Sequence, residues 1–526
     1  MKPNRNGIFT TIAKLMRLWR KQQKVSRGSL TIPKEELSGN LAIDVEAIQS
    51  LFGHADDVIV RHIPQPPGRP DAAVVYIDGL VSKDAIAKQI IERLLEPGNP
   101  HDAHAILSHV SAPDVSAVHT LKQVADALTL GKCVLLQDTR REAMCFGMAE
   151  WNQRNVEEPA SEPTVRGPRE GFTEDLRTNI VLLRRRLRTP ALRSERFVIG
   201  RQSQTQVQLL YLDGIARDEV VAEMRDRIQK IDIDAILDSN YIDELVSDNP
   251  RSPFPSLQRT ERPDRVVADL LEGRVAVIVD GSPIVLSGPT TLLGLLQTSE
   301  DYYLRYHAAS FAREIRWIAG LIGLIAPSVY VAILSYHHEL IPTQLLFTIA
   351  AGREGVPFPP FVEALLMETA FEILREAGLR MPQQIGPALS IVGVLVIGDA
   401  AVRAGLVSPL MIVVVGMTAI ATFALPSNDL ANAIRLLRFP TMVAAAILGL
   451  FGVIFATMLV AALLISSRSL GVPMLSPYIP VWRRGLKDAM VRAPIWALRD
   501  RPWHAVNPDQ IKRQPEGQEP KEENKR

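Results

Sequence analysis

The chain has 526 residues and a formal net charge of +1, from 59 Lys and Arg against 58 Asp and Glu. This balance excludes a nucleic-acid binder that relies on bulk positive charge, and the length predicts two or more domains. Two cysteines, Cys133 and Cys145, are too few for a disulfide framework or a zinc site, so we expect reduced, packed thiols. Residues 1–310 mix charged and apolar side chains as soluble proteins do, whereas long apolar runs dominate residues 311–466.

Residues 1–35 form a predicted basic tail. The first 30 residues carry eight Lys and Arg and no acidic residue, and no continuous apolar core follows that would indicate a signal peptide. Residues 7–24 fit either a short basic amphipathic helix on an anionic membrane surface or a frayed tail. The pattern leaves these two alternatives open.

Two segments of the soluble half resemble each other. AAVVYIDGLV (72–81) and VQLLYLDGIA (207–216) are apolar strand patterns that end in Tyr-x-Asp-Gly, and a helical pattern follows each of them. Such internal similarity predicts that one α/β unit is used twice. We place the two subdomains at 36–150 and 191–300.

Both repeats carry an aspartate directly after the strand, Asp78 in the first and Asp213 in the second. Asp-Gly after a strand is above all turn chemistry, so a ligand-binding role for these aspartates is the minority interpretation. The chain has no phosphate loop, Rossmann fingerprint or nucleophile elbow. We therefore expect no catalytic residues and no cofactor, and hence no enzyme.

Residues 151–190 are predicted to connect the two subdomains through a loop and a helix, with Thr173 as the helix N-cap. Four arginines crowd the end of this helix: Arg184, Arg185, Arg186 and Arg188. They fit a solvated face stabilised by the helix dipole. They fit equally well a basic patch that docks a partner or a membrane.

Four apolar runs are long enough to span ~30 Å of hydrocarbon. They are 315–336, 385–404, 406–425 and 441–466, inside a membrane domain placed at 301–480 and followed by a basic C-terminal tail at 481–526. The second and third runs are almost contiguous and predict a tight hairpin. Basic residues before the first run and after the last predict that both chain ends are cytoplasmic. Arg435 and Arg438 disagree, because this topology puts them on the outer side.

The stretch REGVPFPPFVEALLMETAFEILREAGLRMP (353–382) is acidic although it lies among apolar runs. Helical geometry places four charged residues within about a third of the circumference, with Glu363 pointing elsewhere. This acidic stripe is Glu368, Glu372, Arg375 and Glu376. Three unpaired carboxylates in lipid would cost roughly 8–10 kcal/mol, and a Glu372–Arg375 pair relieves only part of that cost.

The acidic stripe must therefore face water, another subunit or basic partners. Three interpretations stay open: an interfacial helix with solvated carboxylates, a helix that lines or supports an ion path, and a subunit contact. In the hairpin, Asp399 and Arg403 are spaced i,i+4 and are expected to neutralise each other.

One face of the 406–425 run combines hydroxyl and aliphatic side chains. Its members are Met411, Val415, Thr418 and Thr422. Such a face can line a narrow gate. It can also pack against other helices, with each Thr hydroxyl bonded to its own backbone. From the residues alone, packing is slightly favoured.

The segment PSVYVAILSYHHELIPTQLLFTIAAGREGVPFPPFVEALLMETAFEILREAGLRMPQQIGPALSIVGVLVIGDAAVRAGLVSP resembles the GerA spore germination family, A-subunit type. The resemblance extends to SNDLANAIRLLRFP (427–440), to DAMVRAPIWALRDRP (488–502), and to VRGPREGF and NIVLLRRRLR in the soluble half. It covers most of residues 40–505. One departure is Asp399, where the family usually has Gln.

The resemblance implies a protein of the inner membrane of endospores, with the N-terminal domain on the core side. It implies partners: a transporter-like B subunit that holds the nutrient, and a lipoprotein C subunit. It also implies that the chain oligomerises, as a pentamer, into a channel for monovalent cations. His337 and Glu339 match a His-x-Glu pattern, but the remaining ligands of a metal site are missing, so no metal is expected.

The patterns and the resemblance together predict two related α/β subdomains followed by an all-α, multi-span membrane domain. The expected function is a nutrient-gated cation channel subunit that triggers germination, with no nucleic-acid partner. In this hypothesis Met411 or Val415 forms an apolar constriction and Thr418 and Thr422 are wet, while the acidic stripe lies at the pore mouth.

Three alternatives remain. The first is a stage V sporulation AF-type protein that amplifies germination without a nutrient of its own. The second is a secondary transporter, against which stand the lack of an inverted repeat among the runs and of a central charged substrate site. In the third, the soluble half is itself the nutrient sensor.

Overall fold

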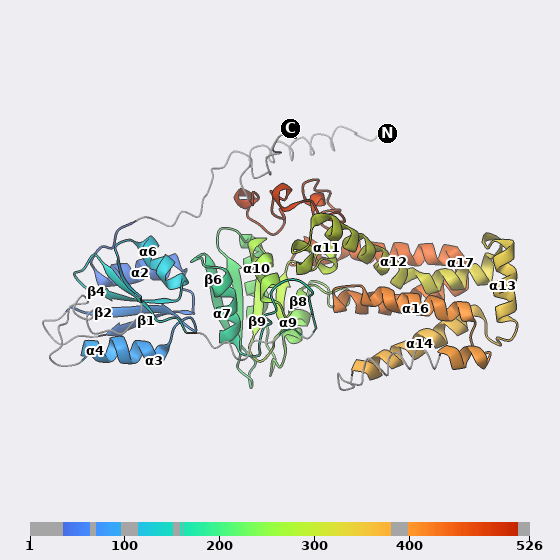
Figure 1. The fold of residues 1–526 in the computed structure, drawn as a ribbon, viewed down its shortest axis with the longest axis horizontal. Helices are drawn as coiled ribbons and strands as arrows, with labels where there is room; N and C mark the ends of the chain where they lie inside the picture. The colour runs from blue at the N-terminus through green and yellow to red at the C-terminus, as the bar shows by residue number, and fades with distance from the viewer. Residues whose placement is uncertain are drawn as a thin grey trace, which may run out of the picture.

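The structure is a computed structural model that describes residues 35–63, 70–95, 114–150, 158–159, 161–379 and 398–513. Figure 1 shows two α/β units and a helical bundle arranged in line, with the second unit between the first unit and the bundle. The predicted basic N-terminal tail lies outside the described residues. So does most of the predicted 385–404 span.

The first unit is an antiparallel five-stranded sheet with the order β1-β2-β4-β5-β3. Its strands are β1 (Val58–Ile63), β2 (Ala72–Ile77), β3 (Val115–Val118), β4 (Lys132–Gln137) and β5 (Ala143–Gly147). One face carries α2 (Leu41–Leu51) and α6 (Leu121–Thr129), and the other carries the helical stretch α3 (Lys83–Ile86), η1 (Ala87–Ile91) and α4 (Glu92–Leu95). Alternate side chains of the strands therefore enter two separate cores.

The two cysteines lie on neighbouring strands of this sheet, and both are free and buried, as predicted. Burial raises the pKa of the Cys145 thiol to about 11, and burial likewise raises that of Cys133. Both thiols are therefore protonated and unreactive at neutral pH.

The second unit repeats the path of the first, with the strand order β6-β7-β9-β10-β8. Its strands are β6 (Leu192–Ile199), β7 (Thr205–Leu212), β8 (Gln258–Thr260), β9 (Val275–Val279) and β10 (Val285–Gly288). Helices α8 (Asp218–Gln229) and α9 (Ser239–Val246) cover one face, and α7 (Leu176–Arg186) and α10 (Pro263–Leu271) cover the other. A shared strand order is the arrangement expected when one unit is used twice.

Helix α7 does not begin as predicted. Its N-cap is Asp175, whose carboxylate accepts from the Thr178 backbone N–H, whereas the Thr173 backbone N–H donates to the side chain of Asn179. The arginines at its end are also not all solvated. Arg184 is buried and donates two hydrogen bonds, of 2.7 and 2.9 Å, to the buried Asp57 of the first unit.

Both interpretations of the basic helix end are therefore wrong for Arg184, because this side chain joins the two α/β units. The turn interpretation of the repeat aspartates agrees with their contacts. Asp78 pairs with Lys83 at 2.7 Å, and Asp213 pairs with Arg193 at 2.5 Å. Arg193 also donates to the backbone oxygen of Leu51, a second link between the units.

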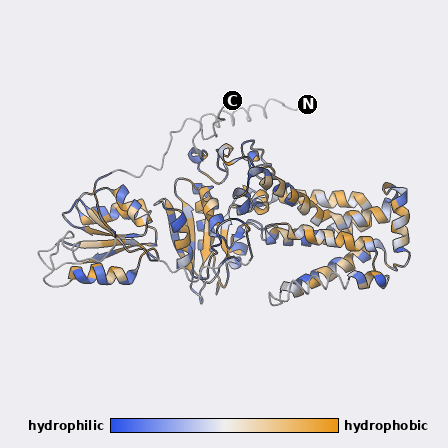
Figure 2. Cartoon of the chain, viewed as in Figure 1, coloured by the Kyte–Doolittle hydropathy of each residue, from blue (hydrophilic) through white to orange (hydrophobic). Residues whose placement is uncertain are grey.

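The bundle contains α12 (Tyr306–Tyr336), α13 (Thr343–Arg353), α14 (Pro360–Leu379), α16 (Pro409–Phe423) and α17 (Asn428–Ser466). By length and composition, α12 and α17 are the two described helices that are long and apolar enough to cross a membrane. Figure 2 shows that most of their residues are hydrophobic. Helix α16 is apolar but has only 15 residues, so it rises roughly 22 Å and is shorter than the predicted span.

The run 441–466 is not one continuous span, because α17 breaks at Gly449, where φ is 61° and ψ is −142°. Gly449 lies against Tyr336 and His337 at the far end of α12. Leu430 and Leu463, near the two ends of α17, nevertheless belong to one apolar cluster. The two arms of α17 therefore fold back on each other, with the reversal at Gly449.

This reversal gives the bundle two ends. We call the end beside the second α/β unit proximal, because α11 (Leu292–Leu296) packs there against α12, α17 and Leu425, which follows α16. The end at Tyr336 and α13 is distal (Figure 1). Because the first arm of α17 starts at the proximal end, Arg438 lies buried inside the bundle, and Arg435 is partly buried nearer that end.

The chain after α17 is more than a basic tail. A short hairpin of β11 (Arg468–Ser469) and β12 (Val472–Pro473) leads into a segment that returns to the second α/β unit. There Val506 pairs with Ala216, and Arg501 donates to the backbone oxygen of Leu271. Residues 467–513 thus close the junction between soluble region and bundle.

Candidate functional site in the helical bundle

Glu368 is the centre of a buried polar cluster. Its carboxylate accepts hydrogen bonds from Arg438 Nη1 at 2.5 Å and from Thr418 Oγ1 at 3.1 Å. Arg438 Nε donates to the backbone oxygen of Gly323 at 2.7 Å. Glu368 and Arg438 are 0% and 1% exposed. Four helices, α12, α14, α16 and α17, therefore meet at one ion pair that water does not reach.

The acidic stripe changes character along α14. Glu372, one turn after Glu368, is half-buried and pairs with Arg375 at 2.9 Å, as predicted, with Arg435 at 3.7 Å on its other side. Glu376, a further turn on, is exposed. Negative charge is thus buried and neutralised in the middle of the bundle and becomes accessible toward the proximal end.

A second buried cluster lies nearer the distal end and was not expected from the sequence. Glu363 is 0% exposed, pairs with Arg353 at 2.7 Å, and accepts from the backbone N–H and the hydroxyl of Ser408 at 2.6 and 2.5 Å. Tyr330 completes the cluster, with its hydroxyl 2.9 Å from the Ser408 hydroxyl and 3.1 Å from Arg353 Nη1. Each of the two clusters ties α14 to α12 and α16.

The signals for this second cluster were weak. Ser408 before Pro409 is a typical N-cap followed by Pro at the first helical position, and its side chain does cap α16. Arg353 and Glu363 stand on either side of a Pro-rich turn. Nothing in their spacing indicates that the turn brings them together.

The predicted gate face of α16 points into the bundle. Its four residues are all buried: Met411, Val415, Thr418 and Thr422. Thr422 Oγ1 donates to the backbone of its own helix, and a Cβ on Gly323 of α12 would lie 3.3 Å from the Thr422 methyl group. In this conformation a water path along the face would be closed by packing within one chain.

The opposite face of α16 is exposed and entirely apolar. It consists of Val413, Met417, Ile420 and Phe423. Asp399 and Arg403, just before α16, form the predicted pair at 2.8 Å, and both are largely exposed. No cluster of three metal-ligating side chains occurs among the described residues, which include His337 and Glu339.

Two ion-pair groups connect the soluble region to the bundle at the proximal end. Arg259 of β8 donates to Asp243 of α9 at 2.8 Å, and to Asp429 at the start of α17 at 3.4 Å. Asp301, which precedes α12, accepts from Arg313 at 3.0 Å and from Arg316 at 2.9 Å. Burial opposes ionisation of Asp301, but the bonds and charges of Arg316 and Arg313 lower the pKa of this carboxyl.

The chain thus has two α/β units and a helical bundle with charged groups inside. Salt bridges join the second α/β unit to the bundle. Residues 46–504 match the family described as Bacillus/Clostridium GerA spore germination protein. The chain belongs to this GerA family. The resemblance to GerA proteins of the A-subunit type is therefore confirmed.

Among GerA relatives, the chain is 43% identical over 483 residues to "Spore germination protein KA" of Bacillus subtilis (strain 168). The aligned residues cover 90% of this chain and 88% of that protein. It is 42% identical over 469 residues to "Uncharacterized membrane protein YfkQ" of the same strain, covering 89% and 91%. A crystal structure of the N-terminal domain of the A subunit of the Bacillus megaterium spore germinant receptor GerK3 matches with 32% identity and a TM-score of 0.40, covering 49% of this chain and 98% of that one.

The GerA bundle keeps the Glu368–Arg438 pair away from solvent. An ion pair as buried as Glu368–Arg438 contributes little net stability, whereas separating its partners costs several kcal/mol. Two arrangements of the helices that differ in this pair would therefore be well separated in free energy.

Proposed function

We propose that this GerA-family chain is the A subunit of a nutrient germinant receptor, and that copies of it form a cation channel that opens when the nutrient binds. The receptor would lie in the inner membrane of the endospore, with the α/β units on the core side. A transporter-like B subunit would hold the nutrient and a lipoprotein would be the C subunit. The copies would form a ring, proposed as a pentamer.

The apolar exterior of the bundle supports a membrane setting with subunit contacts. Large aliphatic and aromatic side chains are exposed along both arms of α17: Ile447, Phe451, Ile454, Met458 and Leu459. Together with the exposed face of α16, they form a surface too apolar for water. Lipid tails or neighbouring copies of the chain would cover it.

The observation that carries the proposal is the buried Glu368–Arg438 pair with Thr418 at its side. In a membrane, ionisable side chains are expensive and usually mark an ion path or a switch. Here the pair lies on the inner side of α14 and α16, next to the face that carries Val415. Helix movement that separates the pair would open this face to water and expose the carboxylate to cations.

Gating would reach the bundle through the proximal salt bridges. Arg259 holds the start of α17 to the second α/β unit, and Asp301 holds the start of α12. A change in the soluble region or in a partner subunit would therefore move the two long helices together. This coupling is allosteric only if the nutrient binds the open and closed states with different affinity.

The proposal is tested by ion flux. The chain would be co-reconstituted with its B and C subunits into K⁺-loaded vesicles, and amino acids, sugars and nucleosides would be added in turn. We expect K⁺ efflux with the nutrient that triggers the receptor and none with the others. Movement of the nutrient itself, without net K⁺ efflux, would instead indicate a secondary transporter.

The stage V AF-type amplifier is a second candidate, because the motifs shared with the GerA family do not separate it from a receptor subunit. An amplifier channel would use the same bundle. It would conduct cations without B and C subunits and without a nutrient, so the same vesicles prepared from the A chain alone separate the two functions.

A further inference from the structure

We infer that residues 478–496, here named the interfacial segment, form a docking surface for anionic lipid headgroups at the proximal end of the bundle. The inference rests on the proposed membrane insertion of α12 and α17. It goes further, because it assigns a lipid contact to a part of the chain that lies after the last helix of the bundle.

The interfacial segment lies at the level where α12 enters its apolar part. The ring of Tyr478 meets that of Trp317 edge-on at 6.2 Å, and the Arg492 backbone N–H donates to Ser310 Oγ at 3.0 Å. Phe311 and Ile315, on the same turns of α12, are already exposed apolar residues. The segment therefore flanks the first turns that would meet the membrane.

The exposed side chains of the segment have the composition of a membrane interface. Six are apolar: Ile479, Val481, Met490, Val491, Ile495 and Trp496. Three exposed cationic residues stand among them: Arg483, Arg484 and Lys487. Trp beside Lys and Arg next to a membrane helix is typical of the headgroup region, where rings enter the lipid and cations meet phosphate.

The only acidic residue of the segment is already neutralised. Asp488 accepts from Arg313 Nη1 and from the Tyr302 hydroxyl, both at 2.8 Å. Arg484 lies 3.7 Å from Asp500, a long and exposed contact that leaves its charge available. The outward charge of the segment is therefore positive and complementary to an anionic leaflet.

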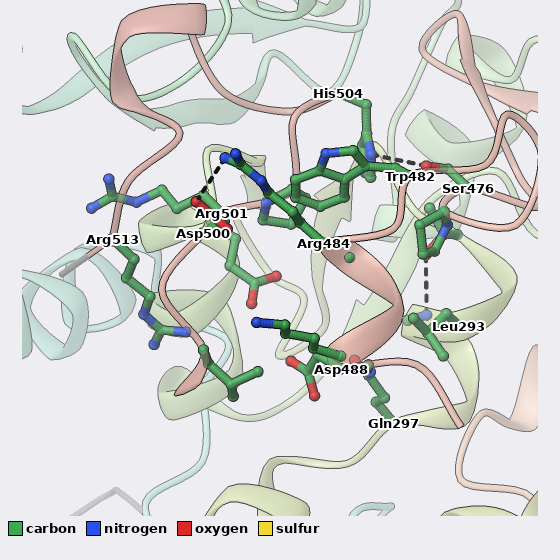
Figure 3. A pocket seen from close by; sticks show the side chains of 18 of the residues that line it. Leu293, Gln297, Ser476, Trp482, Arg484, Asp488, Asp500, Arg501, His504 and Arg513 are labelled. Carbon is green, nitrogen blue, oxygen red and sulfur yellow. Dashed lines mark hydrogen bonds and ion pairs between the residues drawn. The ribbon is translucent and has the colours of Figure 1, made fainter. Parts of the chain in front are cut away.

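The inner side of the segment is fixed to the protein. Trp482, Arg484 and Asp488 line a cavity of about 70 Å³ together with Gln297 and His504 (Figure 3). Gln297 Nε2 donates to the Asp488 backbone oxygen at 2.7 Å. A cavity of this size has room for only a few water molecules. Lipid is the partner that fits both the level of the exposed apolar side chains and the positive charge beside them.

The test uses the full chain in vesicles and three matched Val→Cys variants with an environment-sensitive fluorophore on the new thiol. Val491→Cys reports the segment, Val198→Cys on β6 is the soluble control, and Val443→Cys on α17 is the insertion control; these valines are 54%, 57% and 45% exposed. The two native cysteines are buried, so the unchanged chain treated with the same fluorophore gives the background signal.

The quencher is a lipid with a nitroxide in its headgroup region. The vesicles contain phosphatidylcholine alone or equal parts of phosphatidylcholine and phosphatidylglycerol. We expect at least twofold stronger quenching at position 491 than at 198, and stronger quenching with phosphatidylglycerol. With the added changes Arg483→Glu and Arg484→Glu, quenching at position 491 should no longer be stronger in vesicles that contain phosphatidylglycerol.

Quenching at 491 as weak as at 198, with strong quenching at 443, overturns the inference and leaves membrane insertion intact. Weak quenching at all three positions overturns insertion as well, and with it the proposed function. Protection of position 491 that appears only when B and C subunits are added would assign the surface to a protein partner and also contradict the inference.

Discussion

Glu368 of α14 and Arg438 of α17 form an ion pair that is almost completely removed from solvent, with 2.5 Å between Oε2 and Nη1. The two residues are 70 positions apart in the chain. Their contact, shared with Thr418 and the backbone of Gly323, joins four helices at the centre of the bundle.

Glu368→Gln should destabilise the bundle, because it removes the negative charge and leaves Arg438 buried without a counter-ion. The expected loss is about 3–5 kcal/mol of unfolding free energy, since breaking one side of a buried pair is costly. Denaturant unfolding of the detergent-solubilised chain measures it. Glu376→Gln, on the exposed part of the same helix, should change stability by less than about 0.5 kcal/mol.

The double variant Glu368→Gln/Arg438→Met distinguishes charge from shape. Neutralising both partners removes the uncompensated charge, so stability should recover most of the loss seen in Glu368→Gln. If the double variant were as unstable as the single one, packing at position 368, and not the unpaired charge, would explain the loss of unfolding free energy.

Val415→Ala tests whether the buried face of α16 closes an ion path. The smaller side chain should loosen the packing beside Thr418 and increase K⁺ efflux from receptor vesicles without nutrient. Val413→Ala, two positions away on the exposed face, makes the same chemical change and should leave efflux at the basal level. Equal K⁺ efflux from both variants would show that the buried face of α16 does not form the gate.

Arg259→Met tests the coupling between the second α/β unit and α17. Its guanidinium joins Asp243 to Asp429, so its loss should weaken nutrient-triggered efflux while basal efflux stays low. Arg201→Met removes an exposed pair with Asp232 in the same unit and serves as the control. An unchanged nutrient response in Arg259→Met would show that the signal enters the bundle elsewhere.

His504 gives the soluble region a predicted pH dependence. Burial, together with the charges of Arg274 and Arg217, lowers the pKa of His504 to about 3 from 6.5. The folded state therefore keeps the ring neutral while the unfolded state takes up a proton below pH 6.5. Stability should thus be complete above that pH and fall by up to about 1.4 kcal/mol per unit as the pH drops from 6.5 toward 3.

The measurement is the unfolding free energy of the chain at a series of pH values. His504→Gln should be less stable at neutral pH and should have a flatter slope between pH 6 and 4, because the titrating group is absent. The exposed His62→Gln should keep the slope of the unchanged chain. Identical slopes in all three proteins would assign the acid sensitivity to other groups.

Local geometry explains what could be predicted from the sequence. Helical spacing correctly paired Glu372 with Arg375 and Asp399 with Arg403, because partners one turn apart are fixed by the helix itself. The cost of carboxylates in lipid indicated that Glu368 faces water, another subunit or a basic partner, and the structure provides a basic partner in the same chain. That this partner is Arg438 depends on how distant helices pack, which no local spacing encodes.

The errors have the same physical origin. Arg184 lies at a helix end that looks exposed, yet it is buried because Asp57, 127 residues earlier, folds against it. The reversal of α17 depends on one glycine in an apolar run. Gly449 adopts a positive φ that other residues rarely adopt, but a glycine inside such a run more often packs in a continuous helix.

The central claim is that the nutrient opens a cation path through the bundle of this chain. The most direct measurement is K⁺ efflux from vesicles that contain the chain with its B and C subunits, recorded on nutrient addition for the unchanged chain and for Val415→Ala. The account predicts nutrient-dependent efflux from the unchanged chain and efflux without nutrient from the variant. Uptake of the nutrient without any K⁺ efflux from either protein would contradict it.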